Sequence, residues 1–293
     1  MIVLYGSVRS TRLARRIDRS LLDLPLNTGT IVTHHLANAG ACAKRFGLKD
    51  FEMRVLVDTS SRAPKMHDDG AGVEGVRLVI QQDASPIRGV AGVLADATKD
   101  MDDDEYIIVT SGAQIYLESL SDMVYAMAKK EADVSFVTSN DGAPVGVWLI
   151  RCGVLKSIKS IGYVDLKEQA LDQWKHEHKV CVVERPRAYT HSTRSRVEYI
   201  SAILAEGDGF GAGKTIDEDP YREDWESSFS IVEPGATVGD GVVLHDSVVL
   251  NGATIGKGAV IVRSVICANG HVAPGARVTD RVLTESVKKV RGQ

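Results

Sequence analysis

Five arginines lie close together near the start of the chain. They are Arg9, Arg12, Arg15, Arg16 and Arg19. A guanidinium pairs well with phosphate, so this run is a candidate phosphate clamp. The last four also fall three or four residues apart, a spacing that groups side chains on one side of a helix. A phosphate clamp and a solvated helix face therefore both remain open.

A second candidate for phosphate chemistry is the stretch GDGFGAGKT at residues 207–215. It looks like the glycine-rich loop that cradles nucleotide phosphates. That loop needs a glycine five residues before the glycine of its Gly-Lys pair, and Asp208 occupies this position. It also follows a strand, whereas this stretch follows a predicted helix. We therefore expect no nucleotide-binding P-loop here.

The C-terminal part of the chain repeats itself every seventeen residues. The aligned columns are Val238, Ile255 and Val272; Gly241, Gly258 and Gly275; Val249, Ile266 and Leu283; and Ser247 with Ser264. A fixed period of this kind predicts a solenoid, in which each unit buries its apolar edge against its neighbours. Apolar residues recur about every six positions within a row, which is typical of hexapeptide-repeat β-helices.

The preceding two-thirds of the chain alternate between strand-like and helix-like segments. We expect strands at residues 2–5, 53–58, 77–81, 106–109, 134–138, 145–151 and 180–183, and helices at 30–43, 90–98, 117–132 and 194–205. This alternation predicts an α/β fold with a mostly parallel sheet covered on both faces. The predicted organisation is an α/β domain at 1–206, a linker at 207–229, a β-helix at 230–287 and a basic tail at 288–293.

Composition excludes several classes of protein. A formal net charge of -4 argues against a nucleic-acid surface, which would usually be basic. The cysteines at 42, 152, 181 and 267 form no CxxC pair, which argues against a zinc site and suits a reducing compartment. The opening apolar run is too short for a secretory signal or a membrane span. We expect a cytoplasmic protein without nucleic-acid or membrane partners.

An α/β domain followed by a short hexapeptide β-helix resembles the sugar-nucleotide pyrophosphorylases, in particular their glucose-1-phosphate adenylyltransferase and mannose-1-phosphate guanylyltransferase branches. The motifs that carry the resemblance are TRL at 11–13, GVAG at 89–92, IIVTSG at 107–112, the strand at 145–151, DLKE at 165–168, residues 191–200 and the repeat itself. The resemblance implies a Rossmann-like nucleotidyltransferase domain and a left-handed parallel β-helix.

The resemblance also implies a set of site residues. It assigns nucleotide binding to Gly6, Thr11, Arg12, Gln82, Gly89, Ala91, Gly92 and Gly112, sugar binding to Gly146, Asp165 and Glu168, and catalysis to Arg12 and Arg19. In the family reaction a sugar 1-phosphate attacks a nucleoside triphosphate and pyrophosphate leaves. Such transfer depends mostly on positioning and charge neutralisation, and carboxylates hold the Mg²⁺.

This chain lacks much of that charge. Ala113 stands where the family has one metal-binding aspartate, and Ser192, or with a slip of one His191, falls where it has the second. The family's lysine near the glycine-rich loop is missing unless Arg19 replaces it, and arginine is no conservative substitute for lysine. We therefore assign no metal ligands, and Mg²⁺ is expected only if the protein is active.

Three functions remain open. The first is a degenerate relative that binds a nucleotide or nucleotide sugar as a sensor or regulatory subunit in sugar-nucleotide or polysaccharide metabolism. The second is an active pyrophosphorylase with an altered metal site, in which Asp165 and Glu168 supply the charge. The third is a hexapeptide-repeat acyltransferase that uses His245 or His271 as a general base. A homo-oligomer, or a hetero-oligomer with an active paralogue, is expected.

Overall fold

The computed structural model of this chain describes residues 1–5, 11, 13–17, 19–65, 73–83, 88–140, 142–185, 190–207 and 229–287. The contacts divide the chain into two units. Unit 1 holds Met1–Ser10 and Val32–Thr190, and unit 2 holds Thr11–Ile31 and His191–Gln293. Every helix in these ranges falls short of the length and hydrophobicity that crossing a membrane requires. The basic tail and most of the predicted linker, including its P-loop-like stretch after Gly207, lie outside the described residues.

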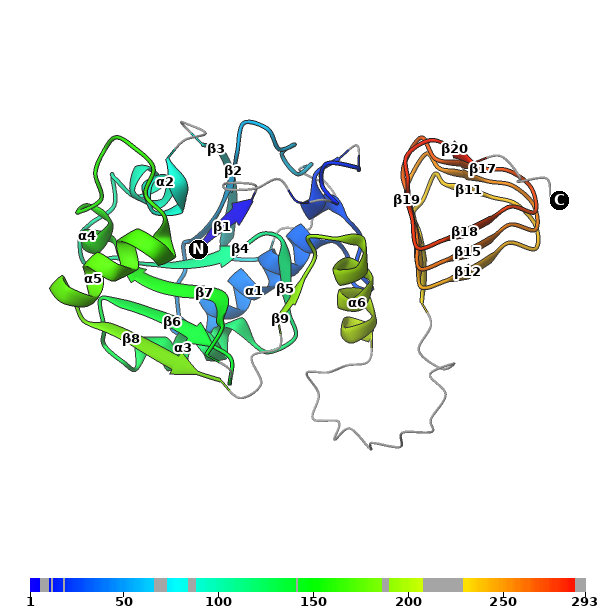
Figure 1. Ribbon diagram of the computed structural model, residues 1–293. Helices are drawn as coiled ribbons and strands as arrows, with labels where there is room; N and C mark the ends of the chain where they lie inside the picture. The colour runs from blue at the N-terminus through cyan, green and yellow to red at the C-terminus, as the bar shows by residue number, and fades with distance from the viewer. Residues whose placement is uncertain are drawn as a thin grey trace. The chain divides into compact units, whose positions relative to one another are not determined.

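A mixed sheet is the centre of unit 1, and its seven described strands follow the order β3-β2-β1-β4-β7-β6-β8 (Figure 1). These strands are β1 (Ile2–Tyr5), β2 (Phe51–Val57), β3 (Val76–Gln82), β4 (Tyr106–Ser111), β6 (Val134–Thr138), β7 (Pro144–Arg151) and β8 (Val180–Glu184). Strand β7 runs antiparallel to its two neighbours, and the other pairs are parallel. The prediction of a mostly parallel sheet is confirmed.

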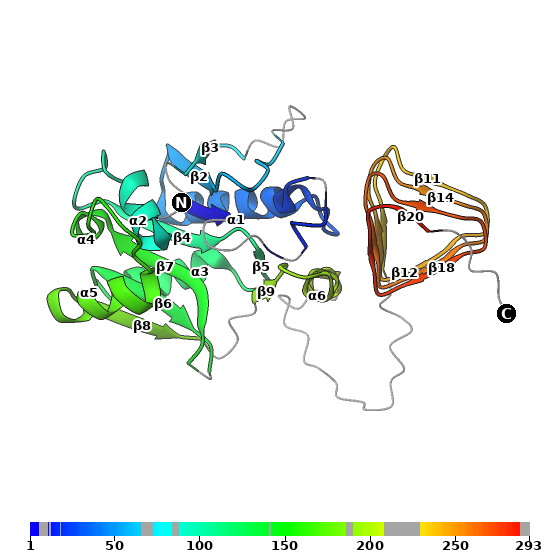
Figure 2. The same ribbon diagram turned by 45° about the horizontal axis from the view of Figure 1, so that its top comes forward.

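Helices cover both faces of this sheet. They are α1 (Ile31–Phe46), α2 (Gly89–Ala97), α3 (Leu120–Ala128), α4 (Cys152–Leu155) and α5 (Leu171–Glu177), which a single π-helical turn, η2 (Leu166–Ala170), precedes. The chain passes from β1 to β2 through α1 and from β3 back to β4 through α2. Because right-handed crossovers in opposite directions use opposite faces, α1 and α2 lie on different sides of the sheet (Figures 1 and 2).

The predicted helix at 117–132 is too long by several residues. Helix α3 begins after Ser119, whose hydroxyl accepts a hydrogen bond from the N–H of Asp122 at 3.3 Å. Serine is a preferred residue at this N-terminal position. Beyond the last turn, Glu131 has a φ of 46°, which a helix does not allow. The Ser119 cap therefore sets the start of α3, and the positive φ of Glu131 limits how far the helix can extend.

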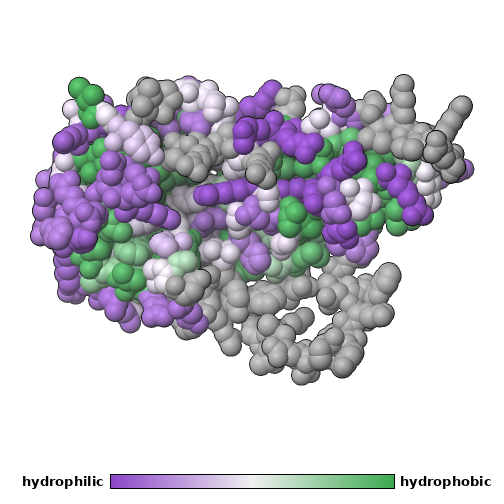
Figure 3. Space-filling model, viewed as in Figure 1, coloured by the Kyte–Doolittle hydropathy of each residue, from purple (hydrophilic) through white to green (hydrophobic). Residues whose placement is uncertain are grey.

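Helix α5 was not among the predicted helices. Its one fully buried side chain is Trp174, whereas Asp172, Lys175 and Glu177 are exposed. The surface over α4 and α5 is accordingly hydrophilic in Figure 3. A helix of seven residues is too short to show a helical period in the sequence.

Unit 2 contains the predicted parallel β-helix, whose first strand begins at Ser230. Its strands are β10 (Ser230–Val232), β11 (Thr237–Val238), β12 (Val243–His245), β13 (Ser247–Val249), β14 (Thr254–Ile255), β15 (Val260–Val262), β16 (Val265–Ile266), β17 (His271–Val272), β18 (Arg277–Thr279), β19 (Val282–Leu283) and β20 (Ser286–Val287). They stack into three parallel sheets, in which Ser230 pairs with Ser247 and Thr237 with Thr254. The seventeen-residue period is therefore one turn of the solenoid.

Two columns of the repeat have clear physical causes. Gly241, Gly258 and Gly275 have φ values of 67°, 67° and 65°, a backbone conformation that favours glycine. Ser247 and Ser264 are fully buried. The hydroxyl of Ser247 accepts the N–H of Ser264 at 3.2 Å, and the hydroxyl of Ser264 accepts the N–H of Arg281 at 3.1 Å. The buried serines thus join successive turns.

Besides the solenoid, the described part of unit 2 includes η1 (Leu21–Asp23), α6 (Arg196–Gly207) and the end of β9 (Thr190–Ser192). Strand β5 (Gln114–Tyr116) belongs to unit 1.

Replacing Ser264 with alanine should lower the free energy of unfolding by about 1–2 kcal/mol, because it removes a buried hydroxyl that accepts one hydrogen bond and donates another to the carbonyl of Val262. Urea unfolding followed by circular dichroism measures this loss. The exposed Thr279→Ala variant in the same solenoid is the control and should change stability by less than about 0.5 kcal/mol. Equal effects of the two substitutions would contradict the serine ladder.

Candidate functional site

The carboxyl ends of four parallel strands meet at one edge of the unit 1 sheet. Gly112, directly after β4, donates its N–H to the carbonyl of Leu4 at 2.7 Å. Asp83, directly after β3, donates to the carbonyl of Val57 at 2.8 Å. The chain runs outward from β1 to β2 and β3 and then returns to β4, so the strand order reverses beside β1. Open α/β sheets bind ligands at the carboxyl edge at such a reversal.

The segment at 89–92, to which the family resemblance assigns the nucleobase contacts, begins α2. Gly89 has a φ of 69°, and a Cβ added there would lie 2.4 Å from the carbonyl oxygen of Val164. Ala91 donates its N–H to the same oxygen at 3.1 Å. Since the predicted sugar segment at 165–168 follows directly, the structure brings the predicted nucleobase and sugar segments side by side.

Within the predicted sugar segment, Asp165 has a structural task. Its carboxylate oxygen Oδ1 accepts the N–H groups of Lys167 at 2.8 Å and Glu168 at 2.9 Å. Its own N–H donates to the side chain of Gln169 at 2.7 Å. This arrangement caps the turn at η2, in the manner of a helix N-terminus. The side chain of Glu168 is exposed.

The positions of the family's metal-binding aspartates do not fit a magnesium ion. Ala113 is buried, with 8% of its surface exposed, and its methyl group offers no ligand. Ser192, in unit 2, uses its hydroxyl to accept the N–H of Arg194 at 3.3 Å. Over the ranges that the structure describes, no three His, Cys, Asp or Glu side chains gather closely enough to hold a metal ion. Mg²⁺ prefers an octahedron of oxygens that includes carboxylates.

The other predicted residues of unit 1 lie on or near the same strands. Gln82 is the exposed last residue of β3. Gly146 lies against the side-chain amide of Gln114, which donates to the carbonyl of Val145 at 3.0 Å and to the hydroxyl of Tyr116 at 2.9 Å. The side-chain N–H groups of Gln114 thus already bond to Val145 and Tyr116.

A buried carboxylate, which sequence reasoning missed, lies beside Gln82. Asp83 is 7% exposed and its Oδ1 has no hydrogen-bond partner. Burial raises the pKa of Asp83 to about 6, and the negative charges of Asp58 and Asp96 add to this effect. Because this pKa lies above its unfolded value, the contribution of Asp83 to stability is lost as the pH rises through about 6. The sequence could have indicated Asp83, because an aspartate directly after a predicted parallel strand lies at the carboxyl edge of the sheet.

Two histidines of α1 lie beside Tyr116. The Nε2 of His34 accepts the N–H of Tyr116 at 3.0 Å, so this nitrogen carries no proton. His35 is completely buried, and neither ring nitrogen has a hydrogen-bond partner. Burial lowers the pKa of His34 to about 4 and that of His35 to about 3, and in His35 the neighbouring His34 adds to the effect. Both rings are neutral at physiological pH.

The arginine run lies mostly in unit 2, and its described part forms turns, so the helix face, one of the two interpretations left open, is not found there. Arg19 pairs with Glu233 at 2.7 Å, and the two side chains are 21% and 15% exposed. Arg16 donates to the carbonyl of Val282 at 3.0 Å. The hydroxyl of Thr11 accepts the N–H of Ala14 at 3.0 Å. Gly6, Arg9 and Arg12 lie outside the described residues.

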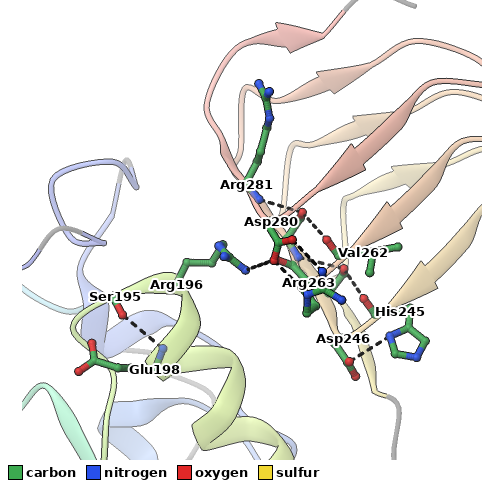
Figure 4. A network of polar contacts seen from close by, with 11 residues as sticks. Ser195, Arg196, Glu198, His245, Asp246, Val262, Arg263, Asp280 and Arg281 are labelled. Carbon is green, nitrogen blue, oxygen red and sulfur yellow. Dashed lines mark hydrogen bonds and ion pairs between the residues drawn. The ribbon is translucent and has the colours of Figure 1, made fainter. Parts of the chain in front are cut away.

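A further arginine of unit 2 joins α6 to the solenoid. Arg196 contacts Asp280 at 3.2 Å, and Arg263 holds the same carboxylate through two bonds of 3.0 and 2.7 Å (Figure 4). Arg263 and Asp280 share a solenoid column with Asp246, and all three have positive φ. The Nδ1 of His245 lies 2.9 Å from the carboxylate of Asp246, also visible in Figure 4. His271 is exposed.

Comparison with solved structures identifies the fold. A putative glucose-1-phosphate thymidylyltransferase from Bacillus anthracis, in complex with a sucrose, is 12% identical with a TM-score of 0.52, and the match covers 73% of this chain and 95% of that one. HddC from Yersinia pseudotuberculosis is 11% identical with a TM-score of 0.49, over 69% and 97% of the two chains. The first likeness shows a sugar-phosphate nucleotidyltransferase-like fold. No family model and no curated protein matches the sequence.

Acid should destabilise this protein through its buried histidines. Because the folded pKa of His35 lies below the unfolded value, the unfolded chain binds more protons between about pH 6.5 and 3, and stability falls as the pH falls. His35→Asn should remove about 2 kcal/mol of the loss between pH 7 and 4.5, measured by urea unfolding at each pH. The exposed His176→Asn variant should keep the wild-type slope. An unchanged slope in His35→Asn would show that His35 does not carry the effect.

Proposed function

We propose that this chain binds a nucleotide or nucleotide sugar at the carboxyl edge of the unit 1 sheet and acts without turnover, as a sensor or regulatory subunit in sugar-nucleotide or polysaccharide metabolism. The single observation that carries the proposal is the buried methyl group of Ala113, at the position where the family reaction needs a carboxylate. The neighbouring Gly112, directly after β4, still bonds to Leu4 of β1, where the strand order reverses.

Charge explains why binding could persist without the reaction. Phosphoryl transfer depends on a metal that neutralises the developing charge, and the residues at 113 and 192 do not fit one. Of the two carboxylates that could compensate, Asp165 already caps η2, and Glu168 is exposed. Binding needs only backbone N–H groups and a few polar side chains in a concave site. A cytoplasmic protein that pairs with a second copy or with an active paralogue would suit such a role.

Replacing Gln82 with alanine should weaken the binding of the preferred nucleoside triphosphate about fivefold, because one hydrogen bond to a neutral group contributes about 1 kcal/mol. Isothermal titration calorimetry with the four nucleoside triphosphates and a set of nucleotide sugars measures this effect. Gln82 is exposed, so the fold should be unaffected, and the exposed Gln173→Ala variant on α5 is the matched control. If the wild-type protein binds none of these compounds, the proposed function fails.

Ala113→Asp should not create pyrophosphate release, because Ser192 leaves the second metal position without a carboxylate. Pyrophosphate is measured with Mg²⁺, the four nucleoside triphosphates and a panel of hexose 1-phosphates. Ala113→Asn, which has the same shape without the charge, separates disruption of the buried position from the effect of the carboxylate. Robust turnover by Ala113→Asp would mean that the rest of the site is intact. Turnover by the wild-type protein would instead identify an active pyrophosphorylase with an altered metal site.

A further inference from the structure

Arg88 precedes α2 and is almost completely buried, with 6% of its surface exposed. Its guanidinium holds the carboxylate of Asp96 through two bonds of 2.8 Å. The same group donates to the carbonyls of Lys159 at 2.9 Å, Gly162 at 3.3 Å and Gly92 at 3.4 Å. These bonds account for all five N–H groups of the side chain.

The backbone at Arg88 forms a second connection between the start of α2 and the loop at residues 159–164. Val164 donates its N–H to the carbonyl of Arg88 at 3.0 Å, and Ala91 donates to the carbonyl of Val164 at 3.1 Å. The close approach at Gly89 leaves no room for a Cβ. Residues 159–164 are thus held to the start of α2 by one side chain and by two main-chain hydrogen bonds.

Only arginine can make this set of contacts. Its planar fork presents five donors in fixed directions, whereas a lysine has a single ammonium group on a flexible stem. The partner Asp96 is on α2, and the carbonyls of Lys159 and Gly162 belong to the loop before the predicted sugar segment. Loss of the guanidinium would release this loop and leave Asp96 without its cation, near the buried Asp83.

We propose that Arg88 is a positioning residue that couples the nucleobase half of the site, residues 89–92, to the sugar half, residues 164–168. Through it the two halves move as one body, so that a nucleotide bound at one half orders the other half for a sugar phosphate. The proposal rests on the proposed function for its ligands, whereas the tether itself is a property of the free protein.

The test uses the full chain with Arg88→Lys, which keeps the charge and loses the fork, and with Asp96→Asn, which keeps the arginine. Arg77→Lys on β3 is the matched control, because Arg77 is an exposed arginine with a single carboxylate partner. Hydrogen exchange of the free protein reports the tether at the amides of Ala91 and Val164. Calorimetry with the tightest-binding nucleoside triphosphate and with glucose 1-phosphate, each alone and then together, reports the coupling.

We expect exchange at both amides to be at least about tenfold faster in Arg88→Lys and moderately faster in Asp96→Asn, with Arg77→Lys unchanged. In the wild-type protein the triphosphate should raise the affinity for glucose 1-phosphate at least about fivefold, and Arg88→Lys should reduce this factor to below about twofold. A merely structural role would weaken both ligands and leave the factor unchanged.

Three results would overturn the inference. Unchanged exchange in Arg88→Lys would mean that the side chain is no tether. Independent binding of the two probes to the wild-type protein would mean that the halves are not coupled. If neither probe binds, the proposed function fails and the coupling fails with it, while the exchange result separately shows whether the tether exists.

Discussion

Strand β1 is the element on which the organisation of unit 1 depends. It is hydrogen-bonded on one side to β2 and on the other to β4. Ile2, Val3 and Tyr5 are 3%, 0% and 3% exposed, as expected for a parallel strand covered on both faces. The backbone N–H and C=O groups of a buried strand must be hydrogen-bonded. A shift of β1 by one residue would therefore disrupt its hydrogen bonds to both β2 and β4. It would also displace Gly112, which bonds to Leu4, and with it the candidate site.

The sequence predicts best the elements whose conformation depends on residues close together in the chain. Each turn of the solenoid solves the same steric problem seventeen residues later, so Gly258 and Gly275 repeat the positive φ of Gly241. The buried strands of unit 1 are visible for a similar reason, because each is a short apolar run. Arg19 shows the limit of such reasoning: its spacing to the other arginines predicts a helix face, but its partner Glu233 lies 214 residues away.

The candidate site could be predicted only in part, because a motif gives residue types without their hydrogen-bond partners. The family resemblance assigns Asp165 to a sugar, whereas in the structure its oxygen accepts the amides of Lys167 and Glu168. The spacing of Asp165 and Glu168 is also that of a helix cap, so the sequence alone left both roles open. Arg88 carries no motif, and two of the carbonyls that define its role are 71 and 74 residues further along the chain. Distant pairings of this kind follow from the tertiary structure alone.

The two neutral residues at the metal positions affect binding and catalysis in opposite ways. A carboxylate at 113 would repel a triphosphate unless a cation stood between them, so in an active enzyme the carboxylates and the metal act together. At the positions that the resemblance matches to these carboxylates, Ala113 and Ser192 supply neither an anchor for a metal nor a negative charge that repels a triphosphate. The carboxylate beside Gln82 is Asp83, and burial raises its pKa to about 6, so this group gains a proton only as the pH falls towards 6. In the function that we propose, the carboxyl edge of the sheet therefore holds an anionic ligand without the groups that transfer needs.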